Sequence, residues 1–202
     1  MVKIKIVFNK KSNKKSLNRK SNKKSNNTKM DKKTGTYLSL CQSNYKKKDD
    51  DWETPAWVLS DLKKIIPAGS VIYDPFYCDG YVKKQWAELG YDCINNDVDA
   101  FDLSKAPSDF DYIVSNIPFS LKQQVFKFFS TNYPDKPILF LIPTECMSSK
   151  WILPYFDKLQ FIISNGRYSF YKKSQQKISS FWKNTCWYCF NCNLPEKLIK
   201  IE

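Results

Sequence analysis

The 202-residue sequence contains no histidine and only five glycines, and it has no long uninterrupted apolar run. Without an imidazole, the chain cannot form a Ser-His-Asp triad, a Cys-His pair or a zinc site that uses histidine. A membrane span needs roughly 20 mainly apolar residues in a row, and no segment approaches that length. These absences exclude histidine-based hydrolysis and argue against a membrane protein.

The seven cysteines are an odd number, and their scattered positions do not match the disulfide framework of a secreted protein. The first eight residues also lack the apolar core of a secretory leader. Both observations predict an intracellular protein of the cytoplasm or nucleus. The spacing of Cys186, Cys189 and Cys192 suggests a metal site, but a strand here turns Cys189 away from the other two, and a fourth ligand is lacking. We therefore interpret these cysteines as core residues and expect no metal.

Positive charge is concentrated at the start of the chain. Residues 1–35 hold thirteen basic residues and one acidic residue, and so carry +12 of the formal net charge of +13. Their Lys, Asn and Ser composition cannot offset the entropy cost of folding. We predict a disordered basic tail over 1–35, an exposed linker over 36–50 and one folded domain over 51–202. The tail keeps the protein soluble, reflects only the compositional bias of the source genome, binds phosphates or serves as a nuclear import signal, and composition leaves these alternatives open.

Apolar periodicity in the domain alternates between the strand pattern and the helix pattern. The predicted strands cover residues 70–73, 91–95, 111–115, 137–143, 160–163 and 186–192. The predicted helices cover residues 55–66, 81–89, 121–130 and 151–156, with Thr54 as the cap of the first. Strands that alternate with helices predict an α/β fold built on a mainly parallel, doubly wound sheet.

The most informative stretch is residues 111–119, where a short apolar strand stops at Asn116. Pro118 cannot donate to a strand ladder and keeps Ile117 extended, so the strand ends there. The Asn116 amide, the Ile117 carbonyl and the Phe119 ring are thus presented together at the carboxyl end of a strand. In open α/β sheets ligands bind at this end, and we expect the site there.

Two loops that follow predicted strands carry acidic residues. Residues 74–80, Asp-Pro-Phe-Tyr-Cys-Asp-Gly, lead from the first strand into a helix and can bring backbone amides against a cofactor. This loop matches neither the dinucleotide-binding glycine pattern nor the P-loop. Asp97 follows the second strand, where a carboxylate can accept both hydroxyls of a ribose, and Asp99 and Asp102 compete with it for that role.

The segment Asn116-Ile117-Pro118-Phe119 resembles the Asn/Asp-Pro-Pro-aromatic motif of S-adenosylmethionine-dependent methyltransferases that act on exocyclic amino groups, mostly adenine N6. Residues 74–80 resemble the family's Asp-Pro-Phe-x-Gly-x-Gly cofactor motif, and residues 52–55 resemble the Thr-Pro segment that precedes it. Cys78 stands at the first glycine of the cofactor motif, and Ile117 stands at the first proline of the other. Only the carbonyl of that proline takes part in the family chemistry, and isoleucine retains it.

The resemblance implies a Rossmann-like class I methyltransferase fold, a seven-stranded, mostly parallel sheet with helices on both faces. It also implies S-adenosylmethionine as the cofactor and nucleic acid, DNA or RNA, as the substrate. The implied catalytic residues are Asn116, Ile117, Pro118 and Phe119. The implied cofactor-binding residues are Trp52, Thr54, Pro55, Asp74, Pro75, Phe76, Tyr77, Gly80, Asp97, Val98 and Asp102.

Methylation of an adenine amino group is difficult because the nitrogen lone pair is delocalised into the ring. The Asn116 side-chain oxygen and the Ile117 carbonyl can hold the two amino hydrogens and favour a pyramidal nitrogen. The catalytic contribution is then positioning with electrostatic help, and no strong base is required. Phe119 would stack on a base held out of any duplex.

Basic and aromatic residues are interleaved over residues 167–183, which suits phosphate contact and base stacking. Arg167, Lys172 and Lys173 are the predicted nucleic-acid-binding residues, and an ordinary solvated hairpin is the alternative. The domain has no room for a separate target-recognition domain, so loops, the tail or a partner protein would select the target. Two other functions stay open, namely methylation of a protein glutamine amide and nucleic-acid binding without turnover.

Overall fold

The computed structural model describes residues 52–164, 166–172, 177–180 and 184–201. The predicted tail and linker lie outside the described residues, as does Lys173. Both domain boundaries therefore stay predictions.

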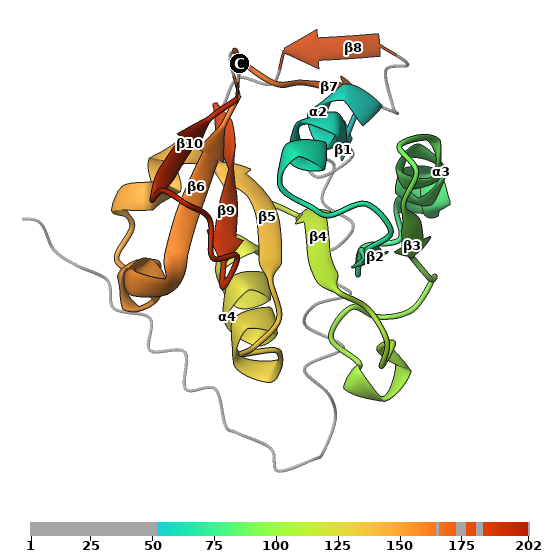
Figure 1. The fold of residues 1–202 in the computed structure, drawn as a ribbon, viewed down its shortest axis with the longest axis horizontal. Helices are drawn as coiled ribbons and strands as arrows, with labels where there is room; N and C mark the ends of the chain where they lie inside the picture. Colours follow the sequence, from blue (N-terminus) through green and yellow to red (C-terminus); the bar gives the residue numbers. More distant parts are fainter. Residues whose placement is uncertain (1–51, 165, 173–176, 181–183, 202) are drawn as a thin grey trace, which may run out of the picture. The chain divides into compact units, whose positions relative to one another are not determined.

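Seven strands form the main sheet, in the order β10-β6-β9-β5-β4-β2-β3 (Figure 1). Their bounds are β2 Val71–Tyr73, β3 Asp92–Ile94, β4 Tyr112–Asn116, β5 Ile138–Pro143, β6 Leu159–Ile163, β9 Thr185–Phe190 and β10 Leu198–Lys200. All are parallel except β9, which runs antiparallel between β5 and β6. The predicted α/β fold with a seven-stranded, mostly parallel sheet is confirmed.

Helices cover both faces of this sheet. On one face, α2 (Ala56–Ser60), the 3₁₀ helix that follows it (Asp61–Lys64) and α3 (Tyr81–Glu88) bury Leu59, Leu62 and Trp86 among others against the strands. On the other face lies α4 (Lys122–Asn132).

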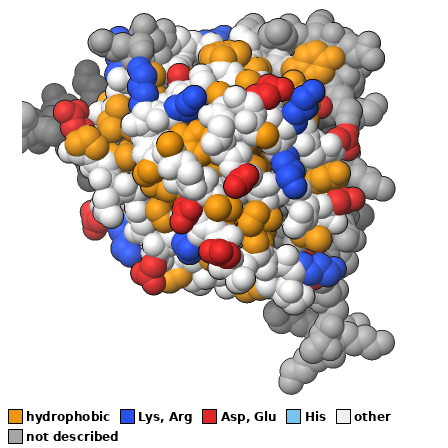
Figure 2. Space-filling view, turned by 45° about the vertical axis from the view of Figure 1, so that its right-hand side comes forward, with side chains coloured by type: hydrophobic (Ala, Val, Ile, Leu, Met, Phe, Trp, Pro, Cys, Tyr) orange, Lys and Arg blue, Asp and Glu red, His pale blue; other side chains and the backbone are white. Residues whose placement is uncertain are grey.

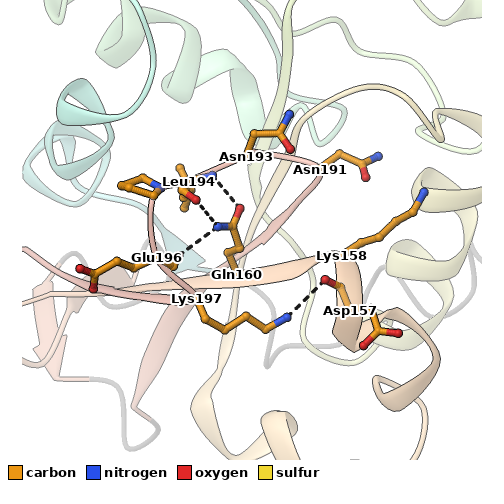
Figure 3. Close-up of a pocket in the computed structure, with 9 residues that line it drawn as sticks. Asp157, Lys158, Gln160, Asn191, Asn193, Leu194, Glu196 and Lys197 are labelled. Carbon is orange, nitrogen blue, oxygen red and sulfur yellow. Dashed lines mark hydrogen bonds between the residues drawn. The ribbon is translucent and has the colours of Figure 1, made fainter.

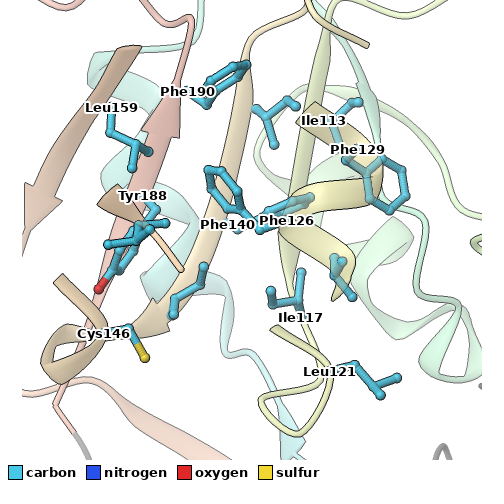
Figure 4. Packing of buried hydrophobic residues seen from close by; sticks show 14 of the residues in the cluster. Ile113, Ile117, Leu121, Phe126, Phe129, Phe140, Cys146, Leu159, Tyr188 and Phe190 are labelled. Carbon is cyan, nitrogen blue, oxygen red and sulfur yellow. The ribbon is translucent and has the colours of Figure 1, made fainter. Parts of the chain in front are cut away.

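The face under α4 is rich in aromatic rings. Phe126 and Phe129 project from α4 toward Phe140 of β5, with ring centroids 6.2 and 5.7 Å from it (Figure 4). Ile117 and Leu121 belong to the same buried cluster, at the carboxyl end of β4. The core therefore reaches the predicted site and anchors the chain just after Asn116.

A second, smaller sheet has the order β1-β7-β8 and contains only antiparallel pairs. Its strands are β1 Trp52–Glu53, β7 Ser169–Lys172 and β8 Lys177–Ser180. Tyr168 and Phe170 at β7 are each 1% exposed and pack in the α2-face core. The Tyr168 hydroxyl also donates to Asp61 Oδ2 at 2.7 Å, so this sheet is tied to the helices on that face.

One local prediction about helices is wrong, and another is right only in part. Thr54 does not cap α2, because Pro55 holds the cap position and no side-chain cap bond forms. Thr54 is instead buried directly after β1, whose pairing with β7 fixes the chain there. The short helix predicted over 151–156 is a 3₁₀ helix over Leu153–Lys158 with a proline in its first turn. Short 3₁₀ helices commonly serve as connectors, and this one leads directly into β6.

The predicted orientation of the three late cysteines is correct for two of them. Cys186 and Cys189 pack into the clusters on opposite faces of the sheet. Cys192 was expected on the side of Cys186 but packs on the side of Cys189, because β9 ends at Phe190 and Asn191 turns the chain with φ +55°. Within the described ranges, no group of three or more acidic, Cys or His side chains could hold a metal, and no helix is long and apolar enough to cross a bilayer.

Candidate active site

The neighbouring parallel strands β3, β2 and β4 end at the same end of the sheet, which we call the carboxyl end. Asp74 follows β2, Asn95 follows β3 and Asn116 is the last residue of β4. Ser115 Oγ, one residue before Asn116, donates a hydrogen bond to Asp74 Oδ1 at 2.8 Å. The loop that resembles a cofactor motif and the strand that carries Asn116 are therefore in direct contact.

Asp74 is a carboxylate with only 4% of its surface exposed. Its Oδ1 also accepts a hydrogen bond from the Phe76 amide at 3.0 Å. Burial raises the pKa of Asp74 to about 7, although the hydrogen bonds from Phe76 and Ser115 oppose the rise. Within the described residues, neither an ion pair nor a hydrogen bond joins a Lys or Arg to Asp74. A buried carboxylate of this kind is a group that a cationic ligand would stabilise in its charged form.

Asn95 is a site residue that sequence reasoning missed. Its Nδ2 donates to the Asp74 carbonyl at 2.9 Å and to the Phe76 carbonyl at 3.1 Å. The residue is 3% exposed, and its Oδ1 has no hydrogen-bond partner in the part of the chain that the structure describes. Asn95 thus holds the start of the 74–80 loop from the neighbouring strand and leaves an acceptor open. The available signal was an amide directly at the end of a predicted strand.

The 74–80 loop keeps a left-handed backbone over three successive residues. The φ angles are +37° at Cys78, +60° at Asp79 and +72° at Gly80. Residues with a Cβ are strained in this region. Cys78, which replaces the first glycine of the family pattern, therefore occupies a conformation that suits glycine. At Gly80 a Cβ would lie 3.2 Å from Tyr77 Cε2, so a side chain there would also press on the Tyr77 ring.

Pro75 and Phe76 anchor this loop in the core. Both are buried, and the Phe76 ring centroid lies 6.4 Å from that of Phe129 on α4. Tyr77 is half-buried, whereas Cys78 and Asp79 are exposed. The loop is thus fixed at its start and presents its strained backbone outward.

The end of β4 presents two acceptors that lack donors. Asn116 Oδ1 is buried without a hydrogen-bond partner, and no hydrogen bond in the described chain reaches the Ile117 carbonyl. The Pro118 and Phe119 carbonyls, in contrast, accept hydrogen bonds at 2.9 and 3.0 Å from residues at the start of α4. An unsatisfied buried acceptor costs about 1–3 kcal/mol, which a donor from a ligand would recover. Because Asn116 Oδ1 is covered here, neighbouring side chains must shift before a ligand reaches it.

The side chains after Asn116 divide between the two faces of the sheet. Ile117 is 2% exposed and lies in the α4-face core, so only its backbone can meet a ligand. Phe119 is half-buried and packs against the opposite cluster, as does Trp52. Pro118, which lies between Ile117 and Phe119 in the chain, is half-buried. Trp52 of the predicted cofactor segment and the predicted stacking ring therefore pack against the same core cluster.

The three aspartates after β3 differ in the hydrogen bonds and ion pairs that their carboxylates already make. Asp102 accepts hydrogen bonds from Ser104 and pairs with Lys105 at 3.4 Å, contacts that lower the pKa of its carboxyl. Asp99 Oδ1 accepts from a backbone amide at 2.9 Å, but its Oδ2 is buried and has no hydrogen-bond partner among the described residues. Asp97 is exposed, and Val98 beside it is half-buried. The Asp102 carboxylate therefore already binds residues of its own turn, and Asp97 and Asp99 are better placed to bind a ligand.

The predicted nucleic-acid contacts lie near the second sheet. Arg167 is exposed, and its Nε donates to Asn184 Oδ1 at 2.8 Å. Lys172 is the last residue of β7, in register with Trp52. On the face shown in Figure 2, blue Lys and Arg side chains are interspersed with red Asp and Glu side chains and form no continuous basic patch. Any phosphate binding on that face would therefore depend on individual residues.

A pocket of about 630 Å³ lies at the opposite, amino end of the sheet (Figure 3). Gln160 of β6 occupies its centre, where Nε2 donates to the Leu194 and Glu196 carbonyls at 2.6 and 3.0 Å and Oε1 accepts from the Leu194 amide at 2.8 Å. Lys197 donates to the Phe156 and Asp157 carbonyls. The polar groups of this pocket clamp the chain between β9 and β10, and none of the predicted site residues lines it.

Comparisons with known proteins give likeness of shape only. No family model matches the chain, and no curated protein matches it. Among solved structures, the chain is similar to a dimethyladenosine transferase from Plasmodium falciparum, with 9% identity and a TM-score of 0.43 over 69% of this chain and 62% of that one. It is also similar to a candidate class I S-adenosylmethionine-dependent methyltransferase from Listeria monocytogenes, with 12% identity and a TM-score of 0.47 over 80% of this chain and 68% of that one. The chain thus spans less than two thirds of the Plasmodium protein, and at these scores neither likeness decides an activity.

Proposed function

We propose that this protein transfers a methyl group from S-adenosylmethionine to the N6 amino group of adenine in a nucleic acid. The observation that carries the proposal is the pair of open acceptors at the end of β4, Asn116 Oδ1 and the Ile117 carbonyl. An exocyclic amino group brings two N–H donors, which matches two acceptors in number. The hydrogen bond between Ser115 and Asp74 puts these acceptors beside the loop that would hold the cofactor.

The residues at the carboxyl end of the sheet fit a cationic cofactor with a nucleoside part. Asp74 offers a buried carboxylate that no Lys or Arg of the described residues pairs with, and the left-handed loop at 78–80 lets a ligand approach the backbone. Asp97 and Asp99 offer carboxylate oxygens for ribose hydroxyls. S-Adenosylmethionine would supply a methyl group bonded to a positively charged sulfur. After the transfer, the sulfur would leave as part of a neutral thioether.

The chain's own contribution is to orient the amino group. Asn116 Oδ1 and the Ile117 carbonyl accept its two hydrogens, which concentrates the lone pair on nitrogen and aims it. We assign the stacking of the base to the half-buried Phe119 ring. Positioning and aimed acceptors then supply the rate enhancement. Methyl transfer leaves the positive charge on the nitrogen, and this cationic amine is acidic enough to lose one proton to water, in keeping with a chain that lacks histidine.

The case for a nucleic acid as substrate rests on charge and on position. Residues 1–35 carry +12, which would add sequence-independent affinity for phosphates. The second sheet, with Arg167 at its start, packs on the same face of the core as Phe119. Basic residues would thus be available near a base stacked on Phe119.

Transfer of labelled methyl groups tests the proposal. The full chain is incubated with S-[methyl-³H]adenosylmethionine and, side by side, with DNA, RNA and a protein mixture. We expect label in DNA or RNA, recovered as N6-methyladenine by mass spectrometry of the digested product. Label recovered only in a protein glutamine amide, or cofactor binding without any transfer, would overturn the proposal.

A further inference from the structure

Ser115 stands between the two motifs of the candidate site and was not predicted from the sequence. It is 2% exposed, lies in β4 and directly precedes Asn116. Its Oγ donates to Asp74 Oδ1, although 41 residues separate the two in the chain. Asp74 is fixed from the other side too, because its carbonyl accepts from Asn95 Nδ2 and its amide donates to the Ile94 carbonyl at 3.0 Å.

We propose that Ser115 is a positioning residue that sets the orientation and the charge of Asp74, so that one hydrogen bond from the catalytic strand governs cofactor binding. This inference rests on the proposed function, because it needs a cationic cofactor at Asp74. A hydroxyl that donates to a carboxylate stabilises its charged form over its neutral form. The strand that presents Asn116 thereby prepares the neighbouring loop for the cofactor.

Two other ionisable side chains interact with Asp74, and neither changes its own charge near neutral pH. Tyr73 on the same strand and Cys93 on β3 interact with it electrostatically, and burial raises the pKa of both well above the ordinary values. Both side chains are therefore neutral between pH 6 and 9. Lys83 of α3 acts on Cys93, lowering its pKa slightly against burial. In this cluster Asp74 is the group that titrates near neutral pH, since burial raises its pKa to about 7.

The affinity for the cofactor should therefore rise with pH as Asp74 becomes ionised. Removing the Ser115 hydroxyl takes away one of the two hydrogen bonds that oppose the effect of burial. The midpoint of the pH profile should then move upward by about one pH unit, the size expected for one hydrogen bond to a charged group. Well above both midpoints the affinity should return close to the wild-type value.

The experiment measures the dissociation constant of S-adenosylmethionine by calorimetric titration from pH 6 to 9.5. Wild type is compared with Ser115→Ala and with Ser115→Cys, which keeps the volume but offers a weaker donor. Ser130→Ala is the matched control, because Ser130 is also buried but donates only to the Lys127 carbonyl within α4. We expect upward shifts for both Ser115 variants, with the smaller shift for cysteine, and a wild-type profile for Ser130→Ala.

Each outcome decides something different. If Ser115→Ala folds poorly, the direction of the shift in Ser115→Cys carries the test. A uniform loss of affinity at every pH, with an unchanged midpoint, would mean that Ser115 has only a structural role and would overturn the inference while leaving the proposed function intact. If wild type itself does not bind S-adenosylmethionine at any pH, the proposed function fails, and this inference fails with it.

Discussion

The two ends of the main sheet contain polar residues of similar kinds but use them differently. At the amino end, both polar ends of the Gln160 amide bind backbone groups, and no pocket-lining residue has a buried side-chain atom without a partner in the described chain. At the carboxyl end, Asn95, Asp99 and Asn116 each keep a buried oxygen to which no described residue donates. The polar groups of the amino end therefore stabilise the fold. The unsatisfied acceptors of the carboxyl end are unfavourable for the fold, and a hydrogen bond from a ligand would remove this cost.

Backbone strain, in contrast to unsatisfied polar groups, occurs at both ends of the sheet. Positive φ angles occur at the carboxyl end in Cys78 and Asp79, and at the amino end in Asn191 and Asn193. Asn tolerates the left-handed region better than most residues, whereas Cys does not. A cavity with strained residues is therefore not enough to identify a site. The difference lies in whether the polar groups already have partners.

The largest effect is expected from Asn116→Ala. The account predicts that methyl transfer falls by about 10²–10³-fold, the usual effect of removing one aimed polar group from a reaction site. Cofactor affinity should stay near wild type. Stability should change by less than about 1 kcal/mol, because the lost amide oxygen has no hydrogen-bond partner in the described ranges. Urea unfolding and single-turnover transfer measure the two effects, and retained turnover would remove Asn116 from the mechanism.

The next effect concerns pH. Burial raises the pKa of Asp74 to about 7 from 3.8, so the folded protein holds a proton that the unfolded chain has lost. The stability from this group is complete below the unfolded pKa and is lost as pH rises through 7, by about 3 kcal/mol between pH 5 and 8.

Urea unfolding at pH 5, 6, 7 and 8 measures this loss against Asp74→Asn, which should show a flatter profile. Asp102→Asn is the control, since local contacts lower the pKa of Asp102 and keep it ionised over this range. Parallel profiles for wild type and Asp74→Asn would contradict the assignment.

At the amino end the expected effect is on stability alone. Gln160→Ala removes three hydrogen bonds that hold the chain between β9 and β10, and should lower the free energy of unfolding by about 2 kcal/mol. Transfer per folded molecule should stay at the wild-type value, the reverse of Asn116→Ala. A loss of turnover at full folding would show that the two ends of the sheet are not independent.

The smallest effect separates strain from steric contact. Gly80→Ala and Gly69→Ala both put a Cβ on a left-handed residue, at φ +72° and +84°, which costs about 1 kcal/mol each. Only at Gly80 does the new Cβ meet a neighbour, the Tyr77 ring at 3.2 Å, whereas nothing lies within 4 Å at Gly69. Thermal unfolding should therefore show a larger loss for Gly80→Ala, and only that variant should bind the cofactor more weakly. Equal losses would mean that the Tyr77 ring moves aside freely.

Much of the main sheet could be predicted from the sequence because its strands are buried on both faces. Of the apolar run at 137–143, residues 138–143 form β5 and are all buried, and the run that stops at Asn116 is β4. The strands that were missed are short or weakly apolar. The residues of β10 are mostly exposed, and β1 has only two residues, so pairing with β6 and β7 defines them.

The site was predictable only where a residue's place in the chain fixes its place in the fold. Asp74 and Asn116 follow predicted strands, and so their shared end of the sheet could be expected. The roles of Ser115 and Asn95 depend on which strands are neighbours and on their register, which one sequence does not contain. The distinction among Asp97, Asp99 and Asp102 depends on side-chain contacts in one turn.

The most direct test of the central claim is to find where the cofactor attaches. Ultraviolet crosslinking of S-[methyl-³H]adenosylmethionine to the full chain, followed by proteolysis and mass spectrometry, locates the labelled residue. The account predicts adducts within residues 74–80 or 116–119, at the carboxyl end of the sheet. Adducts confined to residues 157–160 or 191–197, around the pocket at the amino end, would contradict it.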